Sequence, residues 1–153
     1  MIVKYFDLKK TIIQKEKFFL LYGNNKGLIE DTINKDLKPN FSKNIKTYDE
    51  NEVIENVDIF KEEILNRSFF EKDKLIIINR VSDKILETIE EIRSRNVEDL
   101  KIILKSGILE KKSKIRKFFE KEQDLVVTPF YEDNNQTLFI IAKKFFDEKK
   151  IKI

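Results

Sequence analysis

Five short apolar runs, separated by stretches with helical periodicity, constrain the fold of this chain more than any other feature. The runs are FFLLY at 18–22, NIKTY at 44–48, LIIIN at 75–79, LKIILK at 100–105 and LVVT at 125–128. Strands covered on both faces read as almost continuous apolar runs, and three of the five do so. The run at 44–48 is more polar, so we expect it nearer an edge. This alternation predicts an α/β fold: three layers, with a mostly parallel five-stranded sheet flanked by helices.

Apolar residues between these runs recur at the spacing of one helix face. We expect amphipathic helices at 29–37, 53–64, 85–92, 115–119 and 138–145. A short opening helix is expected to start at Asp7, because aspartate is a favoured residue at helix N-caps. The aromatic doublets 118–119 and 145–146 fall within these patterns, and we expect them mainly in the core.

The composition excludes several classes of function. The sequence has 153 residues, no cysteine and no histidine, which removes thiol nucleophiles, Cys-ligated metals and the commonest general base. We therefore expect no catalytic residue and no metal site. The net charge of +3 does not mark a general polyanion binder. The longest apolar runs are too short to span a bilayer, so we expect a cytoplasmic protein without a membrane partner.

Charge is unevenly distributed along the chain. Residues 49–63 hold seven acidic side chains and one lysine, whereas residues 101–121 hold eight basic side chains and two acidic ones. Either stretch is explained by solvated helix faces. The alternative for the basic stretch is a contact with DNA or with an acidic neighbouring subunit. The candidate residues for such a contact are Lys111, Lys112, Lys114, Arg116 and Lys117.

A glycine-containing loop follows the first apolar run, where nucleotide-binding α/β proteins hold phosphate. It consists of Gly23, Asn24, Asn25, Lys26 and Gly27. A working loop reads G-x-x-x-x-G-K-[ST], but Leu28, Ile29 and Glu30 stand where the last three residues belong. Glu30 would repel phosphate, and Lys26 lies too early to replace the missing lysine. We expect this degenerate phosphate loop not to bind ATP and the chain to need no cofactor.

The third apolar run ends in Asn79 and Arg80, where an ATPase of this kind places an acidic residue that orients the metal. The second half of the ATPase machinery is therefore also missing. We conclude from the sequence that the chain is not an enzyme by itself.

Two adjacent aromatic residues, Phe69 and Phe70, stand in the polar connection RSFFEKDK before the third run. Ile64 and Leu65 already complete the apolar face of the preceding helix. The pair either staples the helix end onto the sheet or forms an exposed wedge, the kind of anchor that dominates protein interfaces.

Three segments in order resemble the N-terminal part of the delta subunit of bacterial DNA polymerase III, the clamp-loader subunit that opens the sliding clamp. They are FFLLYGNNKGLIED, then ILNRSFFEKDKLIIINRV, then DLKIILKSGILEKKSKIRKFFEK followed by DLVVTPF. The resemblance implies a degenerate AAA+-like fold that does not hydrolyse ATP. It also implies that an apolar pair enters a pocket of the beta sliding clamp. By position the pair is Phe69 and Phe70, with Ser68 as the small residue before it; the family often has Leu then Phe there.

The resemblance also carries expectations about domains and partners. Residues 1–135 would be the clamp-binding domain, and 136–153 would start a second, helical domain that is truncated here. Other clamp-loader subunits would be bound through missing C-terminal domains, and DNA indirectly or weakly. Two alternatives stay open: a nucleotide-binding core of ATPase or kinase type, and a general nucleic-acid-binding module that uses residues 101–121.

Overall fold

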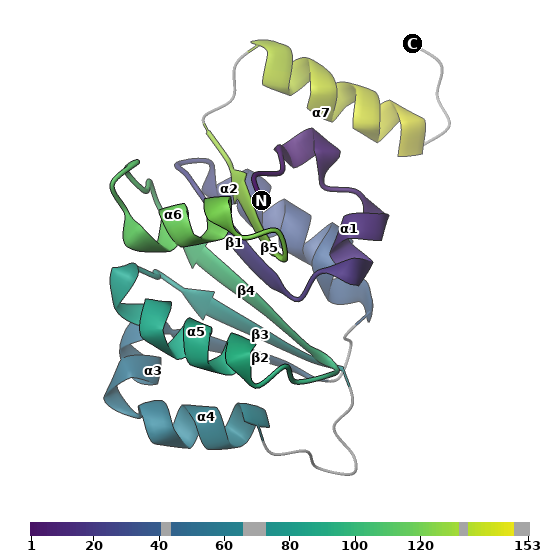
Figure 1. Cartoon of the computed structure of the whole chain (residues 1–153). Coiled ribbons are helices and arrows are strands. Elements are labelled where there is room, and N and C mark those ends of the chain that lie inside the picture. The colour runs from purple at the N-terminus through teal and green to yellow at the C-terminus, as the bar shows by residue number, and fades with distance from the viewer. Residues whose placement is uncertain (41–43, 66–72, 132–134, 149–153) are drawn as a thin grey trace.

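A five-stranded parallel sheet forms the centre of the molecule (Figure 1). The computed structural model describes the chain except for residues 41–43, 66–72, 132–134 and 149–153. The strands are β1 (Phe18–Tyr22), β2 (Ile45–Asp49), β3 (Lys74–Asn79), β4 (Leu100–Ser106) and β5 (Leu125–Pro129). They lie in the order β2-β3-β4-β1-β5, and every neighbouring pair is parallel. All five expected strands are confirmed, and the polar strand β2 is at an edge.

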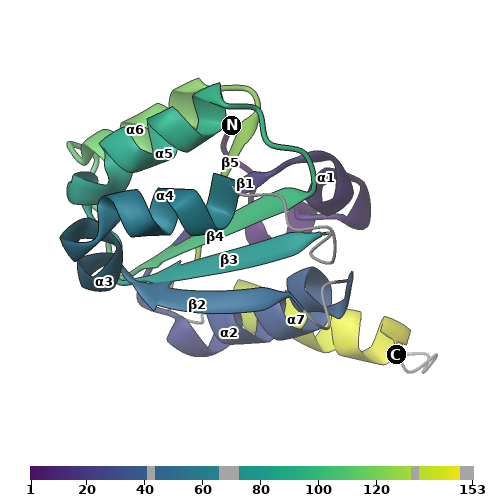
Figure 2. The same cartoon turned by 90° about the horizontal axis from the view of Figure 1, so that it is seen from below.

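Helices cover both faces of this sheet. On one face lie α3 (Glu50–Glu55), α4 (Val57–Leu65), α5 (Leu86–Ser94) and α6 (Lys114–Lys121). On the other lie α1 (Lys10–Lys15) and α2 (Lys26–Thr32), with α7 (Asn135–Glu148) alongside α2 (Figure 2). Short 3-10 turns at Tyr5–Asp7, Lys38–Asn40 and Asp83–Ile85, and a π-helical turn at Ile33–Leu37, complete the described elements.

Alternate residues of each strand enter two separate cores. In β1, Phe18, Leu20 and Tyr22 pack toward α4, α5 and α6, whereas Phe19 and Leu21 pack toward α1 and α2. Side chains alternate between the faces of a strand, so an almost wholly apolar run is required when helices cover both faces. This requirement explains why the strands were easy to locate in the sequence.

Three expectations about helices need correction. The opening helix starts at Lys10, not at Asp7, which lies in a preceding 3-10 turn; the residue at the N-cap is Lys9 and makes no side-chain capping hydrogen bond. The predicted helix at 53–64 is two helices, because the backbone of Asn56 leaves the helical region (φ −135°, ψ 52°). Finally, Phe145 is 51% exposed, so the doublet 145–146 is not mainly core.

Candidate functional site

The loop between β1 and α2 is bonded to the chain's own backbone on both sides. The N–H of Gly23 donates to the carbonyl oxygen of Gly107 after β4 (3.0 Å), and the N–H of Asn25 donates to the carbonyl oxygen of Phe130 after β5 (3.1 Å). The Phe130 N–H in turn donates to the Tyr22 carbonyl oxygen (2.7 Å). Backbone N–H groups of such a loop are what would hold a phosphate. Those of Gly23 and Asn25 instead join three neighbouring loops.

The side chain of Asn25 caps the helix that follows. Its Oδ1 accepts a hydrogen bond from the N–H of Leu28 (3.2 Å), and its Nδ2 donates to the carbonyl oxygen of Tyr131 (3.2 Å). An N-cap oxygen occupies the position in which a helix N-terminus would otherwise attract an anion. Lys26 and Gly27 are the first residues of α2, so the degenerate phosphate loop has only three residues, 23–25, before its helix.

A cleft of about 550 Å³ lies beside this loop, at the carboxyl ends of β2, β3 and β4. Ligands of open α/β sheets bind in this position. Two ion pairs line it, Lys105 with Glu30 and Arg80 with Asp49. Glu30 thus has a cation of the chain itself as its partner. The lining also includes Lys26, which is exposed.

Asn79 stands at the end of β3, where the sequence led us to note a missing acidic residue. Its Oδ1 is buried and has no hydrogen-bond partner among the described residues. An amide oxygen carries no charge, so it lacks the affinity for a divalent cation that a carboxylate would provide. Among the described residues, no group of three or more His, Cys, Asp or Glu side chains could hold a metal ion.

The basic candidates lie together at the start of α6, but they are not equivalent. Lys111 and Lys112 are in the preceding turn, and Lys114 and Lys117 are exposed on α6. Arg116 is turned inward: its Nε donates to Glu120 (2.6 Å), and its Nη1 donates to the carbonyl oxygen of Leu109 (2.8 Å). The first hydrogen bond lies within α6 and the second ties the helix to the loop before it, which makes Arg116 a structural residue.

An aromatic cluster links Arg116 to the degenerate phosphate loop. The guanidinium carbon of Arg116 lies 5.2 Å from the centre of the Tyr22 ring, and the ring of Tyr131 meets Tyr22 edge-on with the centres 6.4 Å apart. Burial, and then a hydrogen bond with Tyr131, raise the pKa of Tyr22 above its ordinary value of 10.0. Tyr22 was expected only as the end of the first apolar run, and Tyr131 lies outside every apolar and helical pattern of the sequence.

The start of α6 has an anionic cap that no pattern in the sequence indicates. The Oδ1 of Asp83 accepts hydrogen bonds from the N–H of Ile115 (3.0 Å) and from Ser113 Oγ (3.0 Å). The hydrogen bond from the Ile115 backbone is the main cause that lowers the pKa of Asp83 below its ordinary value of 3.8. The N-terminus of α6 is therefore occupied by a carboxylate from another part of the chain.

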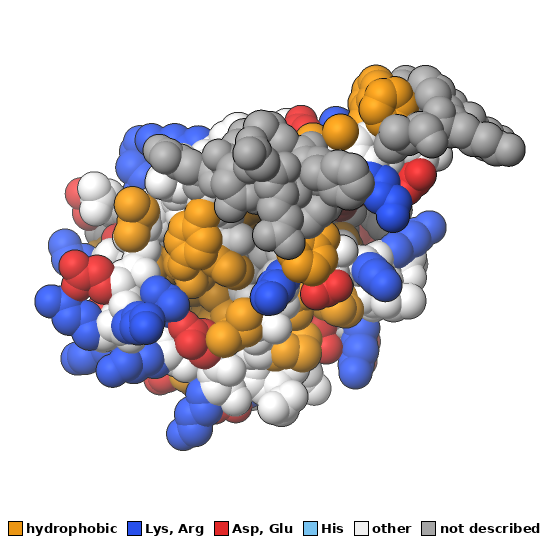
Figure 3. Space-filling view, turned by 90° about the horizontal axis from the view of Figure 1, so that it is seen from above, with side chains coloured by type: hydrophobic (Ala, Val, Ile, Leu, Met, Phe, Trp, Pro, Cys, Tyr) orange, Lys and Arg blue, Asp and Glu red, His pale blue; other side chains and the backbone are white. Residues whose placement is uncertain are grey.

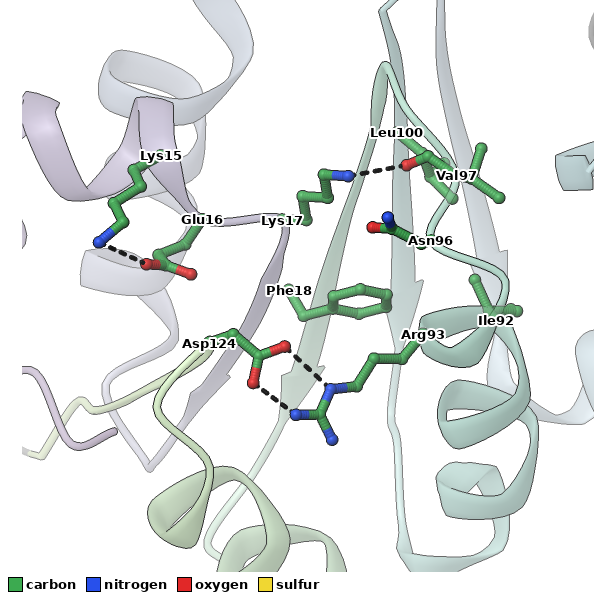
Figure 4. Close-up of a pocket in the computed structure, with 10 residues that line it drawn as sticks. All are labelled: Lys15, Glu16, Lys17, Phe18, Ile92, Arg93, Asn96, Val97, Leu100 and Asp124. Atoms are coloured by element: carbon green, nitrogen blue, oxygen red, sulfur yellow. Dashed lines mark hydrogen bonds and ion pairs between the residues drawn. The ribbon is translucent and has the colours of Figure 1, made fainter.

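A smaller depression, of about 200 Å³, opens at the amino ends of β1, β4 and β5 (Figure 4). Its polar groups bind one another. Arg93 Nε donates to Asp124 Oδ2 (2.9 Å), and Lys17 Nζ donates to the carbonyl oxygen of Val97 (3.1 Å). Because these groups are paired with each other across the depression, we interpret it as a packing contact between α5 and the strands.

The wedge candidates Ser68, Phe69 and Phe70 lie outside the described residues. The residues that flank this segment are described and are bonded to each other. Lys74 Nζ, at the start of β3, donates to the carbonyl oxygen of Glu63 near the end of α4 (3.2 Å). The hydroxyl of Tyr48 donates to Glu63 Oε2 (2.6 Å). The Lys74 contact joins the end of α4 to the amino end of β3, opposite the phosphate-loop edge.

No helix among the described residues is long and apolar enough to span a membrane. No protein-family model and no curated protein sequence matches the chain.

Solved structures that resemble it include the following two. The DNA clamp loader delta protein of Bacillus subtilis superimposes with a TM-score of 0.66 at 14% identity, over 91% of this chain and 46% of that one. A Trip13 protein of Rhizobiales superimposes with a TM-score of 0.54 at 10% identity, over 89% of this chain and 53% of that one. The chain thus spans about half the length of either protein. At these identities the likeness shows the fold, which is that of AAA+-like α/β domains.

Proposed function

We propose that this chain is a clamp-loader-like domain that binds a sliding clamp through Ser68, Phe69 and Phe70 and does not hydrolyse ATP itself. The observation that carries the proposal is the state of the degenerate phosphate loop. Its Gly23 and Asn25 N–H groups donate hydrogen bonds to carbonyl oxygens of the chain itself. A domain that keeps the sheet of an AAA+-like protein while its loop is occupied internally serves as a scaffold. The likeness to a clamp loader delta protein supports this reading.

Hydrogen bonds among the described residues on either side of segment 66–72 support a wedge in this segment. Glu63 accepts hydrogen bonds from Tyr48 and Lys74, so the residues on both sides of the segment 66–72 are fixed to the sheet. Tyr48 is itself packed edge-on against Phe60 of α4, with the ring centres 5.1 Å apart. A wedge carried on rigid flanks loses less conformational freedom on binding than one on a long loop. Placing both phenyl rings in an apolar pocket would contribute roughly 3–6 kcal/mol before the costs of association.

The other partners in this proposal rest on the likeness to the clamp loader delta protein, of which this chain covers 46%. The helix α7 would begin a second, helical domain, and residues 136–153 would be its first part. Contacts with further clamp-loader subunits would be made by that domain. In this account ATP acts on other subunits, and clamp opening is a shift in the clamp's own conformational equilibrium.

The test is a titration of the 153-residue chain with a bacterial sliding clamp. We expect Phe69→Ala combined with Phe70→Ala to weaken binding by at least about 100-fold, which is the equivalent of roughly 3 kcal/mol. Phe69→Leu, which keeps the apolar bulk, should bind within a few-fold of the wild type. Ile59→Ala is the matched control, because Ile59 is 57% exposed on α4 and lies outside the wedge. Undiminished clamp binding by the double variant would refute the proposal.

A further inference from the structure

The solvent face of α6 carries a row of lysines. Lys114, Lys117 and Lys121 follow one another at i, i+3 and i+7, and all three are exposed, whereas Ile115 and Phe119 on the opposite face are fully buried. Residues at this spacing lie on one side of a helix. With a rise of 1.5 Å per residue, their Cα atoms are about 4.5 Å and 6 Å apart along the axis. The three ammonium groups therefore form a row along the helix axis.

The acidic residues of this segment are already paired. Lys112 Nζ lies 3.2 Å from Glu110, and Glu120 is held by Arg116. The Asp83 carboxylate is directed at the backbone of α6, although it lies close enough for the charge of Lys114 to affect it. Neither Lys117 nor Lys121 forms an ion pair with any described residue. The row keeps a positive potential that the chain itself does not neutralise.

An exposed aromatic ring is linked to the same helix through the Tyr22 side chain. Tyr131 is 54% exposed and packs edge-on against Tyr22, which in turn lies against Arg116 of α6. Ile108, 67% exposed, stands next to Gly107 in the neighbouring loop. In the view from above, basic side chains are frequent on the left side of the molecule, with acidic and hydrophobic ones among them (Figure 3). The helix that carries the lysines is thus connected, through Arg116 and Tyr22, to an exposed aromatic ring.

We propose that this surface, formed by Lys114, Lys117, Lys121 and Tyr131, binds single-stranded nucleic acid. The ammonium groups hold successive phosphates, and the Tyr131 ring stacks on an unpaired base. Grooves that bind single strands combine these two elements, a track of positive charge and an aromatic side chain on which bases stack. Arg116 takes no part, because its hydrogen bonds are made within the domain. The proposal does not depend on clamp binding, since it uses none of Ser68, Phe69 and Phe70.

The experiment measures fluorescence anisotropy of a labelled 20-residue oligothymidylate with the 153-residue chain at about 50 and 200 mM KCl. We expect saturable binding that weakens steeply with salt. Changing Lys114, Lys117 and Lys121 to alanine should lower affinity by roughly 10- to 100-fold and flatten the salt dependence. Tyr131→Ala should lower it by about 10-fold, whereas Tyr131→Phe should keep it.

Two matched controls distinguish a loss of affinity caused by this surface from one caused by a change in net charge or in exposed aromatic area. Lys9, Lys10 and Lys15, which are exposed in and before α1, are changed to alanine together and give the same net charge as the α6 triple variant. Phe6→Ala removes a ring that is 51% exposed elsewhere. The proposal is overturned if both triple variants lose affinity equally or if Tyr131→Ala binds like the wild type. It is also overturned if polyglutamate competes as well as the oligonucleotide, which would indicate an acidic protein partner, or if no binding occurs at about 50 mM KCl.

Discussion

The carbonyl oxygen of Phe130 lies 1.9 Å from the point at which a Cβ atom on Gly23 would stand. No side chain fits between two backbones this close. The φ angle of Gly23 is +133°, a region that L residues rarely adopt, so glycine is required here for two separate reasons. Gly27, by contrast, has open space around its Cα and lies in α2. The two glycines of the degenerate phosphate loop therefore have different roles.

We expect Gly23→Ala to lower the free energy of unfolding by about 3 kcal/mol or more, because the Phe130 strand end must move and the hydrogen bond from Gly23 to Gly107 is lost. Gly27→Ala should instead raise stability by about 0.5–1 kcal/mol, since alanine is the better helix former. Urea denaturation of both variants checks this. A Gly23→Ala variant as stable as the wild type would show that the loop is not held by Phe130.

Saturating Mg·ATP should leave the melting temperature of the chain unchanged. Binding at 100 times Kd would add about 2.7 kcal/mol and raise the midpoint by several degrees. The N–H groups of Gly23 and Asn25 are bonded within the chain, and Glu30 lies in the adjoining cleft. A reproducible upward shift that disappears when ATP is replaced by sulfate at equal ionic strength would support the nucleotide-binding alternative.

Asp83→Ala should destabilise the domain by about 0.5–1 kcal/mol at pH 7, because the start of α6 loses its carboxylate cap. The folded pKa of Asp83 is lowered, so the carboxylate's contribution is present above its ordinary value of 3.8 and is lost as the pH falls through the folded pKa. The gap between wild type and variant should therefore shrink as the pH falls below about 4. Glu90→Ala, an exposed carboxylate on α5, is the control. A gap that is constant with pH would contradict the assignment.

Arg116→Lys should lower the free energy of unfolding by about 1 kcal/mol despite preserving the charge. The guanidinium donates to both Glu120 and the Leu109 carbonyl and also lies over the Tyr22 ring. A lysine ammonium cannot match this planar geometry. Lys117→Arg, on the exposed face of the same helix, should change stability by less than about 0.5 kcal/mol. Equal stabilities for wild type and Arg116→Lys would mean that these contacts contribute little.

The strands could be predicted to within a residue or so because each must be apolar on two faces, as the alternation of Phe18, Phe19 and Leu20 between two cores illustrates. Helix ends were harder to predict. Val53 and Ile64 keep one helical spacing across a break at Asn56, since both short helices bury their apolar sides on the same sheet face. Apolar periodicity records which side is buried and does not record a local interruption of the backbone.

The loss of phosphate ligands could be predicted from positions 28–30. The groups of the chain that now bind the loop and Glu30 could not be predicted. The partner of the Asn25 N–H is the carbonyl of Phe130, and the partner of Glu30 is Lys105, 75 residues away. Both pairings are made by the topology of the sheet. The N-cap role of Asn25 could have been predicted, since asparagine just before a helix is a favourable cap. The wedge at Phe69 and Phe70 stays a prediction.

The position of β1 also determines when this chain can complete its sheet during synthesis. β1 is the first strand to leave the ribosome, yet its two neighbours in the sheet are β4 and β5, which are the last strands made. Pairing over such long sequence separations is slow, because a large loop must close first. Until residue 129 has emerged, FFLLY has no partner on one side and is a site for non-native association. A chain that ends before β5 is therefore expected to aggregate, even if all of its helices form.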